Sequence, residues 1–459
     1  MRKSPSTISA VGVFLIAFLA VVQAQNITTL AGGGPTGLSA KTSALGTPWA
    51  VVQDSTGNTY ISDNLSNRVF KVDASGTLTV LAGNIVNNYN QGNHGDGQLA
   101  NAAPLNAPEG IAVDSKGNVY IADTNNNAIR VVNTQSSSIT LEGLTIPAGV
   151  IETIAGDGNG TACSPTTGPC GDGGPATLAT LNGPGGVWLD TGGNVYIADT
   201  LDSRIRVVNM QASAITFYGG TSGVTAITVP PGNIQTIAGT GTAGFNNDGP
   251  APTQKINLPD GIFVTGSAVS NTVVIVIADT INDRVRVVNT QPSLSASVAG
   301  VSILAGNIVT VAGDGVEGYM GDGFAATLAE LNHPSAAVTD NLGNLYIADG
   351  DNLPPPQTVV TSNEVIREVN ASNNVISTVV GDGTRCSNFT LPCGDGKAAT
   401  SANLWAPTGV FLEGSGDLLI ADQNDDAIRQ VVIGGDIQTV MGALLNTVTG
   451  TDALLVLSA

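Results

Sequence analysis

The composition of this chain is that of a folded protein with many turns. Of its 459 residues, 58 are Gly, 22 are Pro and 42% are hydrophobic, whereas 11% are charged; this excludes a solvated disordered polymer, which contains too few apolar residues to form a core. The formal net charge of −20 disfavours nucleic acid as a partner, because a polyanion would be repelled. Abundant Val, Ile and Thr between Gly and Asn clusters favour many short β-strands.

The first 24 residues resemble a secretory signal peptide. Arg2 and Lys3 give a positive start, residues 11–22 are apolar, and Ala24 is a small residue suited to cleavage. The apolar run is too short for a membrane-spanning helix, which needs about 20 residues. We therefore expect residues 1–24 to be removed, no membrane insertion, and a secreted protein that is extracellular or periplasmic.

Two phrases alternate along the rest of the chain. The shorter phrase ends at Gly and occurs seven times, as ITTLAG, LTVLAG, IETIAG, IQTIAG, IVTVAG, ISTVVG and IQTVMG, starting at residues 27, 78, 151, 234, 308, 376 and 437. The longer phrase occurs six times and is clearest from Pro108 to Asn133. Its IAD tripeptide or counterpart ends at Asp63, Asp123, Asp199, Asp279, Asp349 and Asp422.

Each longer phrase contains three apolar stretches separated by two turn sequences, and the shorter phrase adds a fourth strand. Six units of four short strands predict an all-β fold, a six-bladed β-propeller in which no blade can bury its faces alone. We expect the propeller to occupy residues 25–442 and a C-terminal tail to occupy residues 443–459. A partial seventh blade built from that tail is the alternative.

The sequence motifs of the repeats resemble those of a known protein family. P-x-G-[IV]-x-[VL]-D, G-N-x-Y-I-A-D and I-x-T-[IV]-A-G-x-G with a later G-D-G look like NHL-repeat propellers of the exported, teneurin-like type, over nearly the whole mature chain. The resemblance implies a fold and not an activity. NHL propellers serve as protein-binding modules, RNA-binding modules, extracellular sensors and, in a minority, enzymes.

The ends and the insertions of the repeats raise two further points. The short phrase occurs seven times and the long phrase six times, so one copy of the short phrase is surplus. Either residues 27–32 or residues 437–442 therefore form the outer strand of the last blade, which would join the two ends of the chain. Segments 134–150, 210–233 and 290–307 follow third strands. We expect each of them to continue the blade hairpin outward.

Aspartates and arginines recur at fixed places in the units. The loop between units carries Asp96, Asp172, Asp248, Asp322 and Asp395, and strand alternation puts it on the same face as the turn after the IAD phrase. These carboxylates could ligate calcium, but binding of backbone N–H groups in turns is favoured, because the residue recurs in every unit. Salt bridges to an aspartate of the same or the next blade are predicted for Arg130, Arg206, Arg286, Arg367 and Arg429.

The four cysteines form two equivalent local pairs. Cys163 and Cys170, and likewise Cys386 and Cys393, stand directly before a G-D-G loop. An even number in an exported chain predicts two disulfides, Cys163–Cys170 and Cys386–Cys393. No zinc site is expected, because CxxC spacing is absent and His94 and His333 lie in other units.

One repeat position varies and is therefore the candidate for function. The residue after the Pro that opens the innermost strand should surround the mouth of the central channel. Trp49, Glu109, Asp260, Ser335 and Thr408 are the candidate ligand-binding residues, with Gly185 completing the ring. Glu109 and Asp260 could hold calcium. The channel mouth is the place where six-bladed lactonase-like and paraoxonase-like propellers, which this chain resembles in shape, bind calcium. The further ligands and the base of those enzymes have no assignable counterparts in this sequence.

The favoured hypothesis is an exported, non-catalytic propeller that binds a protein, peptide or glycan partner through its loop-rich face. No catalytic residue can be assigned, because the chain has neither a G-x-S-x-G elbow nor HExxH. No cofactor is expected, and calcium is the alternative that the sequence offers. A metal-dependent hydrolase or lyase of the gluconolactonase-like propeller type is the alternative.

Overall fold

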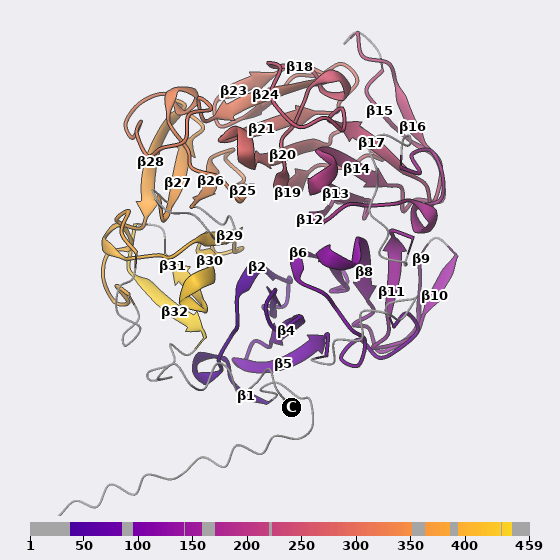
Figure 1. The fold of residues 1–459 in the computed structure, drawn as a ribbon, viewed down its shortest axis with the longest axis horizontal. Helices are drawn as coiled ribbons and strands as arrows, with labels where there is room; N and C mark the ends of the chain where they lie inside the picture. Colours follow the sequence, from indigo (N-terminus) through magenta and orange to yellow (C-terminus); the bar gives the residue numbers. More distant parts are fainter. Residues whose placement is uncertain are drawn as a thin grey trace, which may run out of the picture.

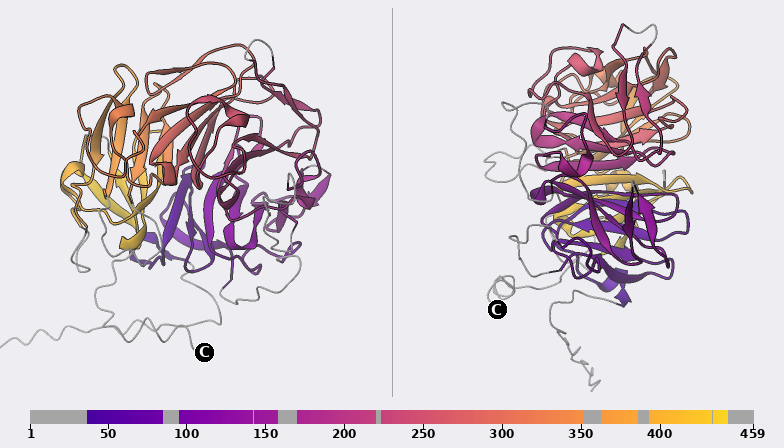
Figure 2. Two further views of the ribbon diagram at one scale, coloured as in Figure 1. Left: turned by 45° about the horizontal axis from the view of Figure 1, so that its top comes forward. Right: turned by 90° about the vertical axis from the view of Figure 1, so that its right-hand side faces the viewer.

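The strands of this protein form a closed ring of six blades around a central channel. The computed structural model describes residues 37–84, 95–141, 143–157, 170–219, 223–350, 363–385, 393–432 and 434–442. In these ranges six sheets of four main strands follow one another around the ring (Figure 1), and the ring is a thick disc when seen from the side (Figure 2). The predicted six-bladed β-propeller is confirmed.

The four strands of each blade are antiparallel and run in chain order from the channel to the rim. The innermost strands are β2 (Pro48–Gln53), β6 (Pro108–Val113), β12 (Pro184–Leu189), β19 (Pro259–Thr265), β25 (Ala336–Thr339) and β29 (Pro407–Leu412). The second strands are β3 (Thr59–Asp63), β7 (Val119–Asp123), β13 (Val195–Asp199), β20 (Val274–Asp279), β26 (Leu345–Asp349) and β30 (Leu418–Asp422). The third strands are β4 (Arg68–Val72), β8 (Ala128–Val132), β14 (Arg204–Val208), β21 (Arg284–Asn289), β27 (Val365–Asn370) and β31 (Ala427–Val431). The outer strands are β5 (Thr77–Ala82), β11 (Ile151–Ala155), β17 (Ile234–Ala238), β24 (Asn307–Ala312), β28 (Val375–Val380) and β32 (Ile437–Met441).

The hydrophobic core lies between the blades. Every residue of the six second strands is buried, which explains why these strands read as continuous apolar runs. Six apolar clusters each draw residues from two neighbouring blades, such as Tyr196 of blade 3 with Ile275 of blade 4. Each blade therefore depends on both neighbours for burial.

The ring is closed by a hydrogen bond that recurs at every blade junction. The Gly after an outer strand donates its N–H to an Ala carbonyl of the following linker, as Gly156 N does to Ala176 O at 3.1 Å. At the last junction Gly442 N donates to Ala40 O at 3.2 Å, so the start of the described chain acts as the linker for its end. The sequence IQTVMG at 437–442 thus forms the outer strand of blade 6, which decides between the two closure alternatives. Residues 27–32, the signal peptide 1–24 and the tail 443–459 lie outside the described residues.

Linkers cover the outer edges of the blades. A linker first pairs with the outer strand of the blade that it enters, as β1 (Leu38–Ser39) pairs with β5 and β18 (Gly249–Pro250) with β24, and single bridges occupy this place in blades 2, 3, 5 and 6. Few strand edges are left for pairing with other chains. Short 3₁₀ helices then lie against the blade that the linker leaves: η1 (Ala40–Thr42), η3 (Ala176–Leu178), η5 (Ala251–Thr253), η7 (Ala326–Leu328) and η8 (Ala399–Ser401).

Four further 3₁₀ helices follow second strands directly. They are η2 (Thr124–Asn126), η4 (Thr200–Asp202), η6 (Thr280–Asn282) and η9 (Gln423–Asp425). None of the described helices has the length and apolar character needed to cross a membrane.

The three long insertions form hairpins of their own at the rim (Figure 1). They pair as separate two-stranded sheets: β9 (Ile139–Leu141) with β10 (Leu144–Ile146), β15 (Ile215–Phe217) with β16 (Ile227–Val229), and β22 (Ala296–Val298) with β23 (Val301–Ile303). The expectation that they continue the blade hairpin was wrong in this respect. An asparagine at the end of the third strand ends the blade pairing, since Asn209 Nδ2 donates to the carbonyls of Ser213 and Val229 at 2.9 and 2.8 Å.

Candidate functional site

The two faces of the ring differ in what they carry. The linker face is formed by the linkers between blades and by the turns after second strands. The hairpin face is formed by the turns after first strands and by the three hairpins, since Ala299 N of β22–β23 donates to Gly343 O in the first turn of blade 5 at 2.9 Å. The predicted channel mouth lies on the linker face, because each innermost strand begins there.

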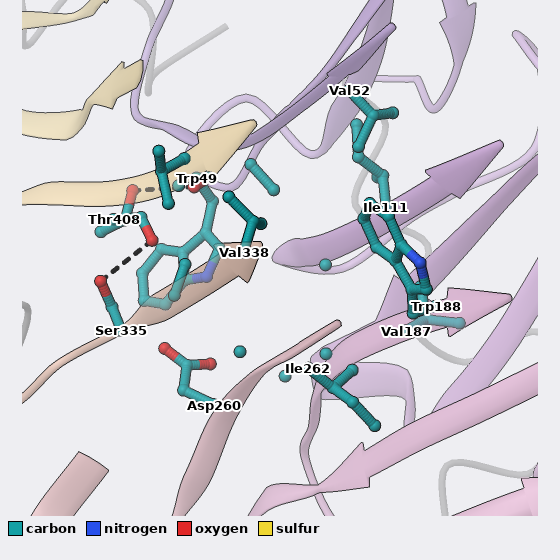
Figure 3. Close-up of a pocket in the computed structure, with 18 of the residues that line it drawn as sticks. Trp49, Val52, Ile111, Val187, Trp188, Asp260, Ile262, Ser335, Val338 and Thr408 are labelled. Atoms are coloured by element: carbon teal, nitrogen blue, oxygen red, sulfur yellow. Dashed lines mark hydrogen bonds between the residues drawn. The ribbon is translucent and has the colours of Figure 1, made fainter. Parts of the chain in front are cut away.

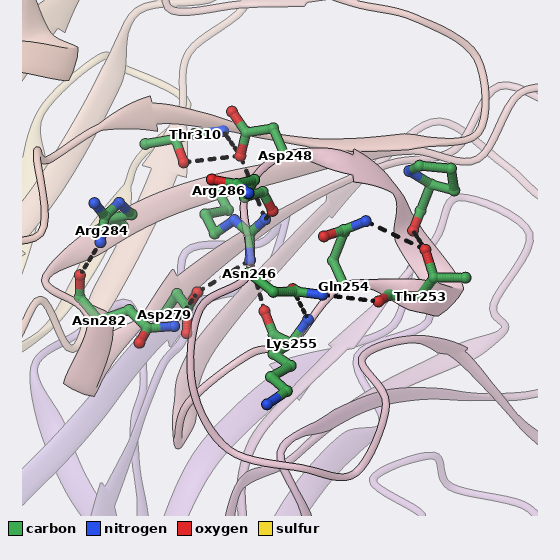
Figure 4. Close-up of polar contacts among 12 residues, drawn as sticks. Asn246, Asp248, Thr253, Gln254, Lys255, Asp279, Asn282, Arg284, Arg286 and Thr310 are labelled. Atoms are coloured by element: carbon green, nitrogen blue, oxygen red, sulfur yellow. Dashed lines mark hydrogen bonds and ion pairs between the residues drawn. The ribbon is translucent and has the colours of Figure 1, made fainter.

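A buried arginine in each of five blades fixes the linker face. In blade 3, Arg206 Nη2 lies 2.7 Å from Asp172 Oδ1 of the linker, and Arg206 Nη1 lies 3.2 Å from Asp199 Oδ2 at the end of the second strand. Figure 4 shows the same arrangement around Arg286 in blade 4. The predicted salt bridges are confirmed, and both aspartates belong to the arginine's own blade or to the linker that enters it. The other three arginines are Arg130, Arg367 and Arg429.

The aspartates also bind backbone N–H groups, as the favoured interpretation predicted. Asp199 Oδ1 accepts from Asn182 N of the linker at 2.8 Å, and Asp172 Oδ1 accepts from Thr236 N of the outer strand at 3.1 Å. These carboxylates therefore hold the linker on its blade and are already engaged. Within the described ranges, no three His, Cys, Asp or Glu side chains come together to hold a metal ion.

The arginines are covered in two different ways. In blades 3 and 6 a cysteine carbonyl accepts from the guanidinium, Cys170 O from Arg206 at 3.0 Å and Cys393 O from Arg429 at 3.2 Å. In blades 4 and 5 an aromatic ring lies against the guanidinium, and in blade 4 the carbonyl of Asn247 also accepts from Arg286 Nη2 at 2.9 Å. The Phe245 ring centroid lies 5.0 Å from Arg286 and the Tyr319 centroid 5.3 Å from Arg367, within the range of a cation–π contact.

Sequence reasoning missed these two aromatic residues. Phe245 and Tyr319 both stand three residues before the linker aspartate, and this shared position is the signal that could have identified them. The two linkers that contain the cysteine pairs have no aromatic residue at this position. A cysteine carbonyl thus accepts from the guanidinium in blades 3 and 6, and an aromatic ring packs on it in blades 4 and 5.

The structure describes one cysteine of each predicted disulfide. Neither Cys170 nor Cys393 is a free thiol. Cys163 and Cys386 lie outside the described residues, so the pairing stays a prediction.

Peptide mapping without reductant should give two crosslinks, Cys163–Cys170 and Cys386–Cys393. Reduction should leave the propeller folded, because each bridge closes one short linker loop and connects no blades. Far-ultraviolet circular dichroism before and after reduction measures this directly. A crosslink between the two distant linkers, or loss of the β signal on reduction, would contradict the prediction.

The central channel holds a small cavity that begins at its mouth and extends along the innermost strands (Figure 3). Its volume is about 60 Å³, room for a few water molecules or an ion, since one water needs about 10–15 Å³. Four of the five predicted ligand-binding residues line it, namely Trp49, Asp260, Ser335 and Thr408. Glu109 lies beside it.

Two of these residues join neighbouring blades. Ser335 Oγ donates to Thr408 O at 2.9 Å, and Thr408 Oγ1 donates to Trp49 O at 2.8 Å, as the dashed lines of Figure 3 show in part. Both hydroxyl groups therefore donate hydrogen bonds to the innermost strand of the next blade. A role of Ser335 and Thr408 in ligand binding stays a prediction.

Glu109 and Asp260 approach each other across a glycine. A Cβ atom on Gly185 would lie 2.5 Å from Asp260 Oδ1 and 3.3 Å from Glu109 Oε2, so only Gly leaves room for both carboxylates. Burial raises the pKa of Glu109 well above its usual value, and the nearby charge of Asp260 adds to this effect. Asn64 Nδ2 donates to Glu109 Oε1 at 3.2 Å and partly offsets it.

Glu109→Gln should change the pH dependence of stability. The raised pKa means that the fold disfavours ionised Glu109, so the wild type loses stability as pH rises through the folded-state pKa. The variant should match the wild type near pH 4 and exceed it at pH 8, by about 1.4 kcal/mol for each unit of pKa difference. Urea unfolding at both pH values measures the gap, and Glu317→Gln at an exposed position is the control. A gap of the same size at both pH values would contradict the prediction.

The repeated four-stranded blades, each ending in a glycine after the outer strand, define an NHL-type β-propeller. The chain belongs to the Teneurin NHL domain family, whose sequence profile matches residues 36–145, 140–231 and 354–452. The resemblance found in the repeats is therefore confirmed.

Two curated relatives are larger proteins that this chain matches over part of their length. It is 26% identical over 376 residues to the chloroplastic protein SUPPRESSOR OF QUENCHING 1 of Arabidopsis thaliana, covering 80% of this chain and 29% of that protein. It is 25% identical over 323 residues to mouse teneurin-1, covering 68% of this chain and 10% of that protein. The chain thus spans less than a third of either relative, and the match concerns the propeller.

Two solved structures share the fold. A Bacteroides thetaiotaomicron protein of unknown function superposes with a TM-score of 0.52 at 13% identity, over 89% of this chain and 73% of that chain. A protein of the same organism described as a putative phosphatase gives 0.51 at 12% identity, over 89% and 75%. At this identity the likeness concerns the fold alone.

Proposed function

We propose that this chain is an exported, non-catalytic β-propeller that binds a protein, peptide or glycan partner on its linker face. The supporting observation is a concentration of exposed apolar side chains on the linker between blades 4 and 5. Met320, Phe324 and Leu328 are 72%, 68% and 70% exposed, and Val316 and Tyr319 are exposed beside them. We call these five residues the apolar linker patch. Exposed apolar residues gathered in one place mark interaction sites.

The chemistry of this patch favours a protein or peptide among the three partner classes. A partner with apolar side chains gains free energy by covering Met320, Phe324 and Leu328. The aspartates of the same linker are engaged by Arg367 and by backbone N–H groups, as Asp322 Oδ2 accepts from Thr378 N at 2.9 Å. Export rests on the leader sequence and on the cysteine pairs, which suit an oxidising compartment.

Capture of partners on immobilised protein tests this function. Wild-type protein and a Met320→Asp, Phe324→Asp double variant should be compared with extracellular material from the source organism. The double variant should retain at most a tenth of the captured partner, because a charge in the patch must be desolvated on binding. Leu342→Asp is the matched control, since Leu342 is 81% exposed in the first turn of blade 5 on the hairpin face. Equal capture by wild type and double variant would contradict the proposal.

The carboxylate pair is the basis of a second proposal, a cation site of low affinity at Glu109 and Asp260. Calcium takes 6–8 oxygen ligands, more than two carboxylates supply, so water would complete the shell and the affinity would be low. The proposal for this pair is binding alone, since within the described residues no third His, Cys, Asp or Glu joins the two carboxylates.

Calorimetric titration with calcium checks this site. The wild type should give a weak binding heat that a Glu109→Gln, Asp260→Asn double variant lacks, because the variant removes both charges. Thermal unfolding of the variant controls for loss of fold. Equal heats in the two proteins would remove the cation site from the account.

A further inference from the structure

A large groove lies where the last blade meets the first. Its volume is about 530 Å³, and it is lined by the strands of blade 6, by blade 1 and by residues 37–41 of the linker into blade 1. We call it the closure groove; its defining residues are Gln53, Val72, Ala74, Leu419, Gln430 and Val440.

The same place between blades 3 and 4 is filled by the protein itself. The hairpin β15–β16 inserts Phe217 and Tyr218, which are 1% and 2% exposed, into the apolar cluster of these two blades. Tyr218 N donates to Thr290 O of blade 4 at 3.0 Å, and Tyr218 Oη donates to Ile237 O of blade 3 at 2.6 Å. The aromatic residue thus joins the two blades through its ring, its hydroxyl and its backbone.

The repeat pattern relates these two junctions residue by residue. Val440 of IQTVMG holds the position of Ile237 in IQTIAG, and Ala74 holds the position of Thr290, four residues after the arginine position. Leu419 holds the position of Tyr196, and Val72 holds that of Val288, which is also a valine. Val440, Ala74, Leu419 and Val72 all line the closure groove. Blade 6 lacks a hairpin because only five residues, 432–436, join its third and outer strands.

The floor of the closure groove is more polar than its counterpart. Gln430 and Gln53 stand where blades 3 and 4 have Val207 and Val264. Both amides donate to the buried carboxylate of Glu413, Gln53 Nε2 to Oε1 at 2.7 Å and Gln430 Nε2 to Oε2 at 2.5 Å. Apolar walls from Val72, Leu419 and Val440 above a polar floor suit a ring with a polar tip, which describes tyrosine.

We propose that the closure groove binds an extended segment of a partner protein that inserts a tyrosine, as Tyr218 inserts between blades 3 and 4. The ring lies between Val72 and Val440, the segment's backbone N–H donates to Ala74 O, and the phenol reaches the carbonyl of Val440 or the side chain of Gln430. This is the use of a groove between strands by an added β segment. The site is separate from the apolar linker patch and goes beyond the function proposed above.

A peptide copied from the protein's own hairpin provides the probe. The synthetic peptide of residues 211–231 should bind the full-length protein in a fluorescence titration. The same peptide with Tyr218→Ala should bind at least tenfold more weakly, because it lacks the ring and the hydroxyl. This comparison needs no variant of the protein itself.

A protein variant locates the site. Val440→Trp fills the groove and should weaken binding of the unmodified peptide at least tenfold. Val379→Trp, the same substitution at the same repeat position of blade 5, should leave binding unchanged. The Met320→Asp, Phe324→Asp variant should also bind normally, so failure of this inference and failure of the proposed function are distinguishable. No binding of the peptide to wild type, or equal binding to wild type and a folded Val440→Trp, would overturn the proposal.

Discussion

The structure depends on a buried arginine that bridges two aspartates in five of the six blades. The guanidinium contacts the end of the second strand, the linker aspartate and linker carbonyls at once, as Arg206 does with Asp199, Asp172 and Thr180 O. Each of these arginines is at most 1% exposed. A buried charge in this setting is favourable only while its partners remain in place, so the arginine fixes the path of the linker that crosses it. The linkers in turn form the face on which the apolar linker patch lies.

In blade 1 the arginine and the linker aspartate are replaced together. Phe70 holds the arginine position, since it pairs with Ile61 as Arg130 pairs with Ile121, and the linker into blade 1 has Thr36 where the other linkers have aspartate. Asp63 remains and accepts from the backbone N–H groups of Gly46 and Thr47 at 2.6 and 3.0 Å. Because the arginine and the linker aspartate are both absent, neither is left without the other as its partner. The first blade, which lies at the ring closure beside the closure groove, thus has Phe70 in place of the bridging arginine, and its Asp63 binds backbone N–H groups and lies near the charge of the buried Arg68.

The repeats made the fold and the arginine bridges predictable from sequence, because strand pattern, turn residues and charge recur in register. The closure was not predictable, since ITTLAG and IQTVMG fit the outer strand equally well and only the tertiary arrangement chooses between them. The meeting of Glu109 and Asp260 at the channel mouth was expected from the variable repeat position, but the role of Gly185, whose missing side chain leaves room for both carboxylates, was not. The closure groove was also missed; it lies at a junction where blade 6 has no inserted hairpin of the kind found in blades 2 to 4. Phe245 and Tyr319 share one repeat position, but an aromatic residue occurs there in two linkers and not in the others, so the repeat pattern did not single them out.

The free energy of unfolding of Arg206→Met tests the central claim most directly. Urea denaturation should show a loss of about 3–5 kcal/mol, the typical effect of leaving buried carboxylates without their cation. Lys116→Met, the same change of charge at an exposed turn position, should alter stability by less than about 1 kcal/mol. A loss for Arg206→Met no larger than that for Lys116→Met would show that the arginine bridges do not hold the blades and linkers together.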